Sequence, residues 1–252
     1  MNDSDITYKI TAPERSLSDF VDSLWMLENH SDIAKDLVVV PDGRIDLFFS
    51  FSDTKPFHAM LMGLESEPTQ TTLSPKTVIY AVSFKLPAIE YIFNISISDI
   101  VNGTQLLPGG FWGIEKSDLI KFEGFCQKVS DKIKENLHFT TDLRKQKLFQ
   151  LIYSSKGALS VEELSEQVHW SSRQINRYFK SRFGMPLKTY CNILRFRASF
   201  HHIAEGKLFP EHNFADQAHF IKEIKRLSGV KPKDLYKNKN DRFLQLSALT
   251  KK

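Results

Sequence analysis

Polar and apolar positions in the C-terminal half of the chain follow a helical period, and one such pattern occurs twice. Ile175 and Phe179 in the first copy, residues 171–180, recur as Phe220 and Ile224 in a second copy 45 residues further on. Apolar side chains at i and i+4 lie on one face of a helix. The pattern therefore predicts two helices with equivalent buried faces.

Both copies also carry signals for the ends of these helices. Ser171 and Asp216 precede the apolar pairs and are residues that cap helix N-termini. Gly184 and Gly229 follow them and suit the left-handed conformation that ends many helices. Because caps, apolar face and end all recur, we interpret the two copies as repeats of one structural unit.

The residues before the first copy predict a supporting helix. Ser160 and Glu163 form a capping-box pattern, so a helix is expected over 161–168. Two short helices joined by about three residues, the second of them cationic, are typical of a helix-turn-helix. Further helices are expected over 143–153 and over 187–205, which Pro186 opens.

The second unit differs from the first upstream of its repeated helix. Residues 204–213 correspond to the supporting segment 159–168, but they contain Gly206 and Pro210. A proline inside a helix costs about 3 kcal/mol. We therefore expect the second unit to have lost most of its supporting helix.

The N-terminal half predicts an antiparallel sheet followed by helices. The Pro41-Asp42-Gly43-Arg44 turn between two β-rich runs predicts a hairpin. The apolar spacing in residues 17–27 suits either a short helix or an entry strand, and we favour the helix. Strands are expected over 37–40, 45–51, 57–64 and 77–84, and helices over 87–93, 96–101 and 117–136.

Residues 136–141 lack periodicity and mark the expected boundary between two domains. We predict an α+β domain over residues 1–140, for sensing or oligomerisation, and an all-α domain over residues 141–252. The second domain is expected to contain two helix-turn-helix-like units, the second truncated.

Charge divides the chain at the same place. Residues 1–140 contain 12 Lys and Arg against 20 Asp and Glu, a net charge of −8, whereas residues 141–252 contain 22 against 10, a net charge of +12. A basic half joined to an acidic half indicates that the C-terminal part meets a polyanion, and nucleic acid is favoured over a merely solvated surface.

Other sequence features point to a cytoplasmic protein without a membrane or a cofactor. No apolar run reaches the roughly 18 residues needed to span a bilayer, and the acidic N-terminus does not resemble a signal peptide. Cys126 and Cys191 lack ligand spacing and are interpreted as buried free thiols. The adjacent His201 and His202 point in different directions on a helix, which disfavours a metal site.

Residues 144–240 resemble the AraC/XylS family of bacterial transcription regulators. The resemblance depends on ordered matches in both units and in the helix between them: Leu164, Ser171, Ile175, Arg177, Phe179, Lys180, Gly184, residues 194–198, residues 214–220, Lys225 and residues 229–232. It implies two helix-turn-helix units, held by a central helix, whose recognition helices enter neighbouring major-groove segments.

The N-terminal half resembles, more weakly, a poorly characterised domain found ahead of AraC-type units. That resemblance depends on residues 40–47 and 82–85. It implies a sensing or oligomerising role, which would involve a small-molecule effector and a homodimer. One departure from the family lies in the first unit, where His169 occupies the turn position usually held by Gly. Histidine tolerates the left-handed conformation better than most residues, so the turn can form.

The resemblance and the chemistry of base recognition together nominate the DNA contacts. Arg pairs with guanine, Asn or Gln with adenine, and an apolar methyl group contacts thymine. The expected base readers are Arg173, Asn176 and Arg177 in the main recognition helix, 171–183, and Gln217, Ala218, His219 and Lys222 in the weaker one, 216–228. The expected phosphate contacts are Gln174, Lys180, Arg182 and Lys225.

The alternative is a ligand-binding or protein-interaction protein whose DNA-binding domain is partly degenerate, as the missing supporting helix would suggest. An enzyme is disfavoured because the sequence has neither a Gly-rich phosphate loop nor a nucleophile elbow. Cys126 lies in an apolar helical stretch and does not resemble the reactive cysteine of a repair methyltransferase. A solvated charged face remains the alternative to each base contact.

Overall fold

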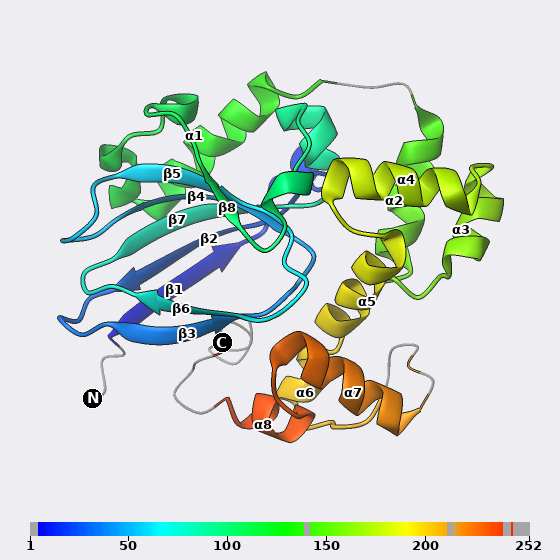
Figure 1. The fold of residues 1–252 in the computed structure, drawn as a ribbon. Coiled ribbons are helices and arrows are strands. Elements are labelled where there is room, and N and C mark those ends of the chain that lie inside the picture. Colours follow the sequence, from blue (N-terminus) through cyan, green and yellow to red (C-terminus); the bar gives the residue numbers. More distant parts are fainter. Residues whose placement is uncertain (1–4, 139–141, 211–213, 215, 239–242, 244–252) are drawn as a thin grey trace.

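A computed structural model describes residues 5–138, 142–210, 214, 216–238 and 243. A sheet-rich N-terminal half lies beside a helical C-terminal half, as Figure 1 shows. The predicted fold class is therefore confirmed, whereas the exact boundary between two domains stays a prediction. Within the described ranges, no helix is long and apolar enough to cross a membrane.

Two antiparallel sheets form the N-terminal half. The larger sheet has six strands, in the order β1 (Ile6–Thr11), β2 (Val21–Asn29), β7 (Val78–Phe84), β4 (Ile45–Phe51), β5 (His58–Met62) and β8 (Thr104–Leu106). The smaller sheet pairs β3 (Lys35–Val39) with β6 (Thr69–Leu73). The strands expected in all four β-rich runs are present, while β1, β6 and β8 were not predicted.

The predicted hairpin around residues 41–44 is wrong. β3 and β4 lie in different sheets, because β3 pairs with β6 while β4 lies between β7 and β5. The turn chemistry is real, since Gly43 has φ of +77° and the Asp42 carboxylate accepts a hydrogen bond from the Arg44 amide. The turn carries the chain from one sheet to the other instead of closing a pair.

The helix expected over residues 17–27 is also wrong. A short 3₁₀ turn over Arg15–Leu17 leads into β2, an inner strand of the large sheet. β2 is buried on both faces, so its apolar residues do not alternate strictly. This double burial produced spacing that resembled a helix.

The two faces of the large sheet have different neighbours. Phe49 and Tyr80 point to one face and pack edge-on against Phe125 of α1 (Phe122–Glu135), at 5.8 and 5.4 Å between ring centroids. The alternate residues on the same strands, including Phe48 and Ile79, point towards β3 and β6 and line a cavity. One face of the large sheet therefore packs in the core, and the other borders the cavity.

Short turns connect the sheet to α1. A π-helical turn over Ile89–Phe93 and 3₁₀ turns over Ser98–Ile100, Phe111–Gly113 and Lys116–Ile120 follow β7. The helix expected over 117–136 is therefore divided. Lys121 is extended, so the regular helix begins at Phe122.

The C-terminal half is helical, as predicted. It comprises α2 (Leu143–Ser154), α3 (Val161–Val168), α4 (Ser172–Phe183), α5 (Leu187–Ala198), α6 (Phe200–Ala204), α7 (Gln217–Ser228) and α8 (Pro232–Lys237). The continuous helix expected over 187–205 is divided at Ser199. The Ser199 hydroxyl donates a hydrogen bond to the Arg195 carbonyl, and its amide donates one to the Phe196 carbonyl. Such side-chain back-bonding competes with regular helix geometry.

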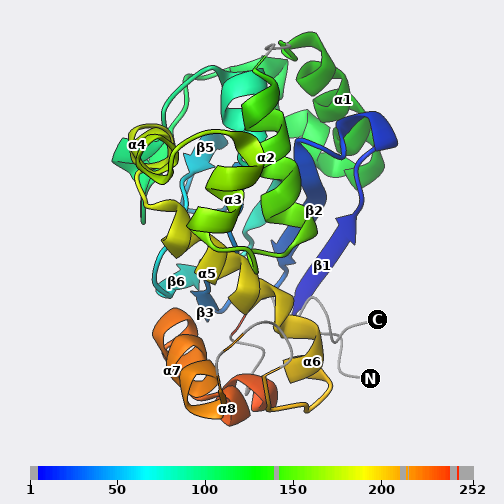
Figure 2. The same cartoon turned by 90° about the vertical axis from the view of Figure 1, so that its right-hand side faces the viewer.

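Both halves contribute to one continuous apolar core. Buried side chains from the sheet, α1, and the helices of the C-terminal half form a single cluster that extends as far as Leu235 and Phe243. Figure 2 shows α5 running from the upper helices down to α6, α7 and α8, beside the sheet. α4 and α7 are thus held on a body that includes the N-terminal half.

Candidate functional site

The first helix-turn-helix unit is built as the sequence predicts. Ser160 and Glu163 form a capping box at α3, and Ser171 and Gln174 form another at α4. His169, between the two helices, has φ of +53° and ψ of +41°. The left-handed turn expected at this position is therefore confirmed, without the glycine that such a turn favours.

The buried face of α4 holds the helix against its neighbours. Ile175, Phe179 and Phe183 are fully buried, and the Phe179 ring lies 6.2 Å from that of Phe149 in α2 and 6.0 Å from that of Tyr190 in α5. This packing leaves the opposite face of α4 to solvent.

The exposed face of α4 carries three cations in a row. Arg173, Arg177 and Lys180 are exposed and lie at i, i+4 and i+7, so they share one side of the helix. None of them pairs with a carboxylate in the part of the chain that the structure describes. A row of unpaired cations on a rigid helix can meet phosphates and base edges.

Two other predicted contacts on α4 point inwards. The Asn176 amide donates to the Ser172 carbonyl at 3.0 Å and accepts from the Leu187 amide at 3.3 Å, so it joins α4 to the start of α5. The Arg182 guanidinium lies 3.2 Å from the Glu90 carboxylate and donates to the Ile95 carbonyl at 2.8 Å. Gln174 is exposed, but its side-chain oxygen is occupied by the Ser171 cap.

The second unit presents the same face with fewer cations. Ala218, Lys222 and Lys225 are exposed at the positions that match Arg173, Arg177 and Lys180. Asp216 caps α7 through the His219 amide at 2.7 Å, and Gly229 ends it with φ of +76°. The predicted repeat of cap, face and end is therefore present in the structure.

The remaining predicted readers of α7 are less available. Gln217 donates its side-chain amide to the Leu208 carbonyl at 2.9 Å, and the His219 ring lies 5.8 Å from that of Phe214. Glu223 pairs with Arg226 at 2.9 Å. α7 thus offers two unpaired lysines, Lys222 and Lys225, on its exposed face within the described residues.

The second unit lacks a supporting helix of its own. Residues 205–210 are not helical, and residues 211–213 of the expected gap lie outside the described residues. α7 packs instead against α5 and α8. Figure 2 shows α4 and α7 towards the same side of the molecule, with α5 between them.

Charged contacts tie the first unit to the N-terminal half. Glu90 follows β7, is buried, and lies 2.9 Å from the Lys145 ammonium and 3.2 Å from the Arg182 guanidinium. Gly184, with φ of +74°, ends α4 so close to Ser98 and Val101 that a Cβ atom there would lie 2.8 Å from the Ser98 carbonyl oxygen. The C-terminal end of α4 therefore rests on the N-terminal half.

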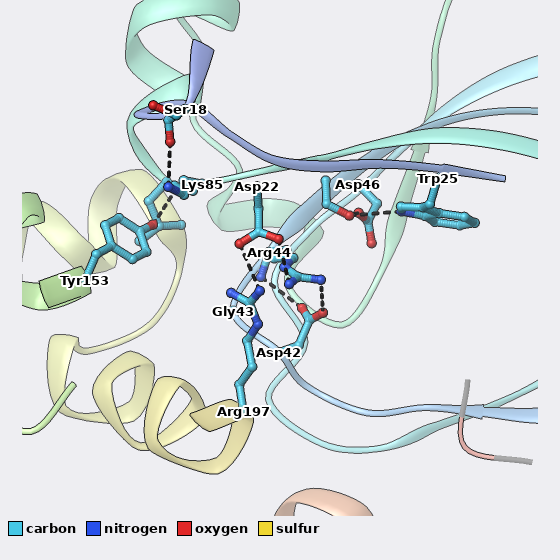
Figure 3. A network of polar contacts seen from close by, with 12 residues as sticks. Ser18, Asp22, Trp25, Asp42, Gly43, Arg44, Asp46, Lys85, Tyr153 and Arg197 are labelled. Carbon is cyan, nitrogen blue, oxygen red and sulfur yellow. Dashed lines mark hydrogen bonds and ion pairs between the residues drawn. The ribbon is translucent and has the colours of Figure 1, made fainter. Parts of the chain in front are cut away.

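A second network joins α5 to the turn between the sheets, as Figure 3 shows. Arg197 on α5 pairs with Asp22 at 2.8 Å, and Asp22 pairs with Arg44 at 2.6 Å. Arg44 also reaches Asp42 at 3.3 Å. Burial opposes the charge on Arg44, but the surrounding Asp42, Asp22 and Asp46 raise its pKa.

The same turn lies at the polar end of a cavity of about 340 Å³, which lies between the large sheet and the β3–β6 sheet. Burial and the neighbouring Asp42 raise the pKa of Asp46 to about 7, and burial raises the pKa of Glu65 to about 8. We did not predict this cavity from the sequence. The sequence feature that could have indicated the cavity is the group of charged residues Asp42, Arg44 and Asp46 inside a β-rich segment.

The two thiols and the adjacent His201 and His202 differ in burial. Burial raises the pKa of Cys126 to about 11 and that of Cys191 to about 12, so both favour the unreactive thiol form. Within the described residues, no three metal-binding side chains come together. His202 is buried beside Phe220, whereas its neighbour His201 is exposed.

Comparison with known proteins gives a domain and a set of distant structures. Residues 9–106 match a domain of unknown function, DUF6597, and this range includes most of both sheets and most of the residues that line the cavity. None of the curated proteins matches the chain.

The similar solved structures are of ToxT from Vibrio cholerae. A 1.65 Å structure of ToxT is 14% identical, with a TM-score of 0.44 over 92% of this chain and 98% of that one. An apo variant is 10% identical, with a TM-score of 0.43 over 93% and 98%. A complex with (E)-4-(8-methylnaphthalen-1-yl)but-3-enoic acid is 14% identical, with a TM-score of 0.42 over 92% and 98%. These values are too low to carry a function or a ligand over to this chain.

Proposed function

We propose that the chain is a sequence-specific transcription regulator of the AraC/XylS type that binds double-stranded DNA. The observation that carries this proposal is the exposed row of Arg173, Arg177 and Lys180 on a helix whose opposite face is fixed in the core. α4 is the main reader, and α7 contributes Lys222 and Lys225 in an adjacent major-groove segment.

The paired residues limit which contacts we propose. Arg173 and Arg177 carry guanidinium groups that can bind guanine in bidentate fashion, and Lys180 is placed to meet a phosphate. Ala218 can touch a thymine methyl group, while Lys222 and Lys225 supply attraction to the backbone. Asn176, Arg182 and Gln217 serve as structural contacts unless DNA displaces their present partners.

Fluorescence anisotropy with labelled genomic fragments tests this proposal. At about 0.1 M salt, where phosphate attraction is already partly screened, some fragments should bind at least tenfold more tightly than a scrambled duplex. Lys121→Ala, which removes an exposed cation from the N-terminal half, should leave the affinity unchanged. Equal affinity for all fragments would contradict sequence-specific binding.

We further propose that the N-terminal half binds a small-molecule effector in its cavity. The Asp22–Arg44–Arg197 network supports this role, because it joins the polar end of the cavity to α5, the helix between the two units. An effector that shifts this network would change how α4 and α7 are held. The family resemblance also implies a homodimer, which sedimentation of the chain with and without DNA would measure.

A further inference from the structure

The cavity in the N-terminal half has a polar end where carboxyl groups gather. Asp42, Asp46, Glu65 and Asn102 line this end beside Arg44, and aromatic, aliphatic and hydroxyl side chains line the rest of the wall, with Lys55 and His58 at the far end. The β4–β7–β2 register places Phe48, Ala81 and Trp25 in one row across the sheet, next to the row that contains Asp46 and Ser83. A ligand that fills this space would therefore have one charged or polar end.

Carboxyl groups outnumber basic side chains at the polar end. Arg44 is the cation there, and its guanidinium already pairs with both Asp22 and Asp42. Asp46 accepts a hydrogen bond from the Ser83 hydroxyl, which in turn accepts from the Trp25 indole at 2.9 Å. Among the described residues, no cation pairs with Asp46.

Glu65 is the second carboxylate without a cation. Its residue is only 9% exposed, it lines the cavity, and no ion pair to it exists in the described part of the chain. Burial raises its pKa, and the charges of Asp42 and Asp46 add to that effect, so the three carboxylates are close enough to interact. A buried carboxylate costs free energy unless it is protonated or paired.

Within the described residues, the basic side chains at the far end of the cavity pair with neither Asp46 nor Glu65. Lys55 and His58 also line the cavity, but His58 pairs with Ser50 in the β4–β5 register, four residues along β4 from Asp46. Four residues of strand span about 13 Å. Lys55 is exposed, and the His58 ring contacts the Pro56 carbonyl at 2.8 Å.

Aromatic side chains border the carboxylates. Tyr8 stacks on Trp25 at 6.3 Å between ring centroids, and both line the cavity together with Phe48. The faces of such rings attract organic cations, most strongly where water is excluded. Carboxylates and aromatic rings together are the usual surroundings of a bound ammonium group.

We propose that the cavity binds an organic cation, a protonated amine or quaternary ammonium group on an apolar body, with Asp46 and Glu65 as its counter-ions. This inference rests on the effector role proposed above and names the class of ligand. A carboxylate group is disfavoured at the polar end, because it would meet three carboxylates beside an arginine that pairs with Asp22 and Asp42.

Three probes of matched shape test the proposal on the full chain without DNA: 4-phenylbutylamine, 4-phenylbutan-1-ol and 4-phenylbutyrate. Isothermal titration calorimetry at neutral pH should show the amine binding at least tenfold more tightly than the alcohol, with no saturable binding of the carboxylate. Quenching of tryptophan fluorescence by the amine should disappear in Trp25→Phe. Because no DNA is present, a negative result in this titration would not contradict the proposed DNA binding.

Glu65→Gln should weaken binding of the amine at least tenfold and leave the alcohol unchanged. Glu67→Gln is the matched control, because Glu67 is exposed and does not line the cavity. If Glu65→Gln fails to fold, the comparison of the three probes on the unaltered chain still tests the proposal. Binding of the carboxylate or the alcohol as tightly as the amine, or no saturable binding of the amine at millimolar concentration, would overturn the proposal.

Discussion

The two helix-turn-helix units share a design at their reading helices and differ in how those helices are held. α4 rests on α3 and α2, and its C-terminal end meets the N-terminal half through Glu90, Ser98 and Val101. α7 rests on α5 and α8 without a supporting helix in the described residues before it. The comparison teaches that the two units share the cap, buried face and end of α4 and α7, while the helices that support α4 and α7 differ.

The largest expected effect comes from the matched core residues Phe179 and Ile224. Phe179→Ala should lower the free energy of unfolding by about 3–5 kcal/mol, because the ring is fully buried among other aromatic rings. Ile224→Ala should loosen mainly the segment around α7. Hydrogen exchange of the two variants shows which helices lose protection. A loss of protection in α4 caused by Ile224→Ala would contradict the idea that α4 and α7 are supported separately.

The two glycines that end the reading helices provide a second matched pair. Gly184→Ala should cost about 2–4 kcal/mol, since it combines left-handed strain with a clash at the Ser98 carbonyl. Gly229→Ala should cost about 1–2 kcal/mol, because the nearest atom to the added Cβ would be Pro68 Cγ at 3.6 Å. Urea denaturation measures both, and equal costs would mean that α4 does not press on the N-terminal half.

Glu90→Gln tests the charged contact between the first unit and the N-terminal half. The change should destabilise the chain by about 1–3 kcal/mol, because Lys145 and Arg182 lose a buried partner while remaining partly exposed themselves. Thermal unfolding of this variant and of the control Glu135→Gln, on the surface of α1, measures the effect. A change no larger than that of the control would show that the contact does not anchor α4.

The smallest expected effects concern DNA affinity. Arg177→Ala should weaken specific binding by about 1–3 kcal/mol and relax base preference. Lys222→Ala, at the matching position of α7, should weaken binding to all sequences by less than about 1 kcal/mol and reduce the salt dependence. A larger loss of base preference from Lys222→Ala would reverse the order of the two readers.

Local signals made the helical half predictable from the sequence. Capping residues such as Ser171 and Asp216 bind amides three residues further along the chain. Because this contact is local, the sequence pattern alone indicates where the helix begins. The same holds for the left-handed turn at His169. The repeat added independent support, because it placed matching signals at a fixed spacing.

Contacts between distant residues explain what could not be predicted. The turn at Gly43 suggested a hairpin, but a Cβ there would lie 3.0 Å from Leu194, and the Tyr190 hydroxyl donates to the Gly43 carbonyl. The position of Arg182 on its helix predicted a phosphate contact, but its guanidinium pairs with Glu90, which is distant in the sequence. The cavity depends on the pairing of β3 with β6, which no short pattern in the sequence specifies.

Selection of bound sequences from a random pool of double-stranded DNA at about 0.1 M salt tests the central claim most directly. For the unaltered chain, we predict one strongly specified segment and a weaker one in an adjacent major-groove segment. In Arg177→Ala, the strong segment should lose its preference while the weak one persists. Failure to enrich any sequence, or a motif that Arg177→Ala leaves intact, would contradict the claim that α4 is the main reader of DNA.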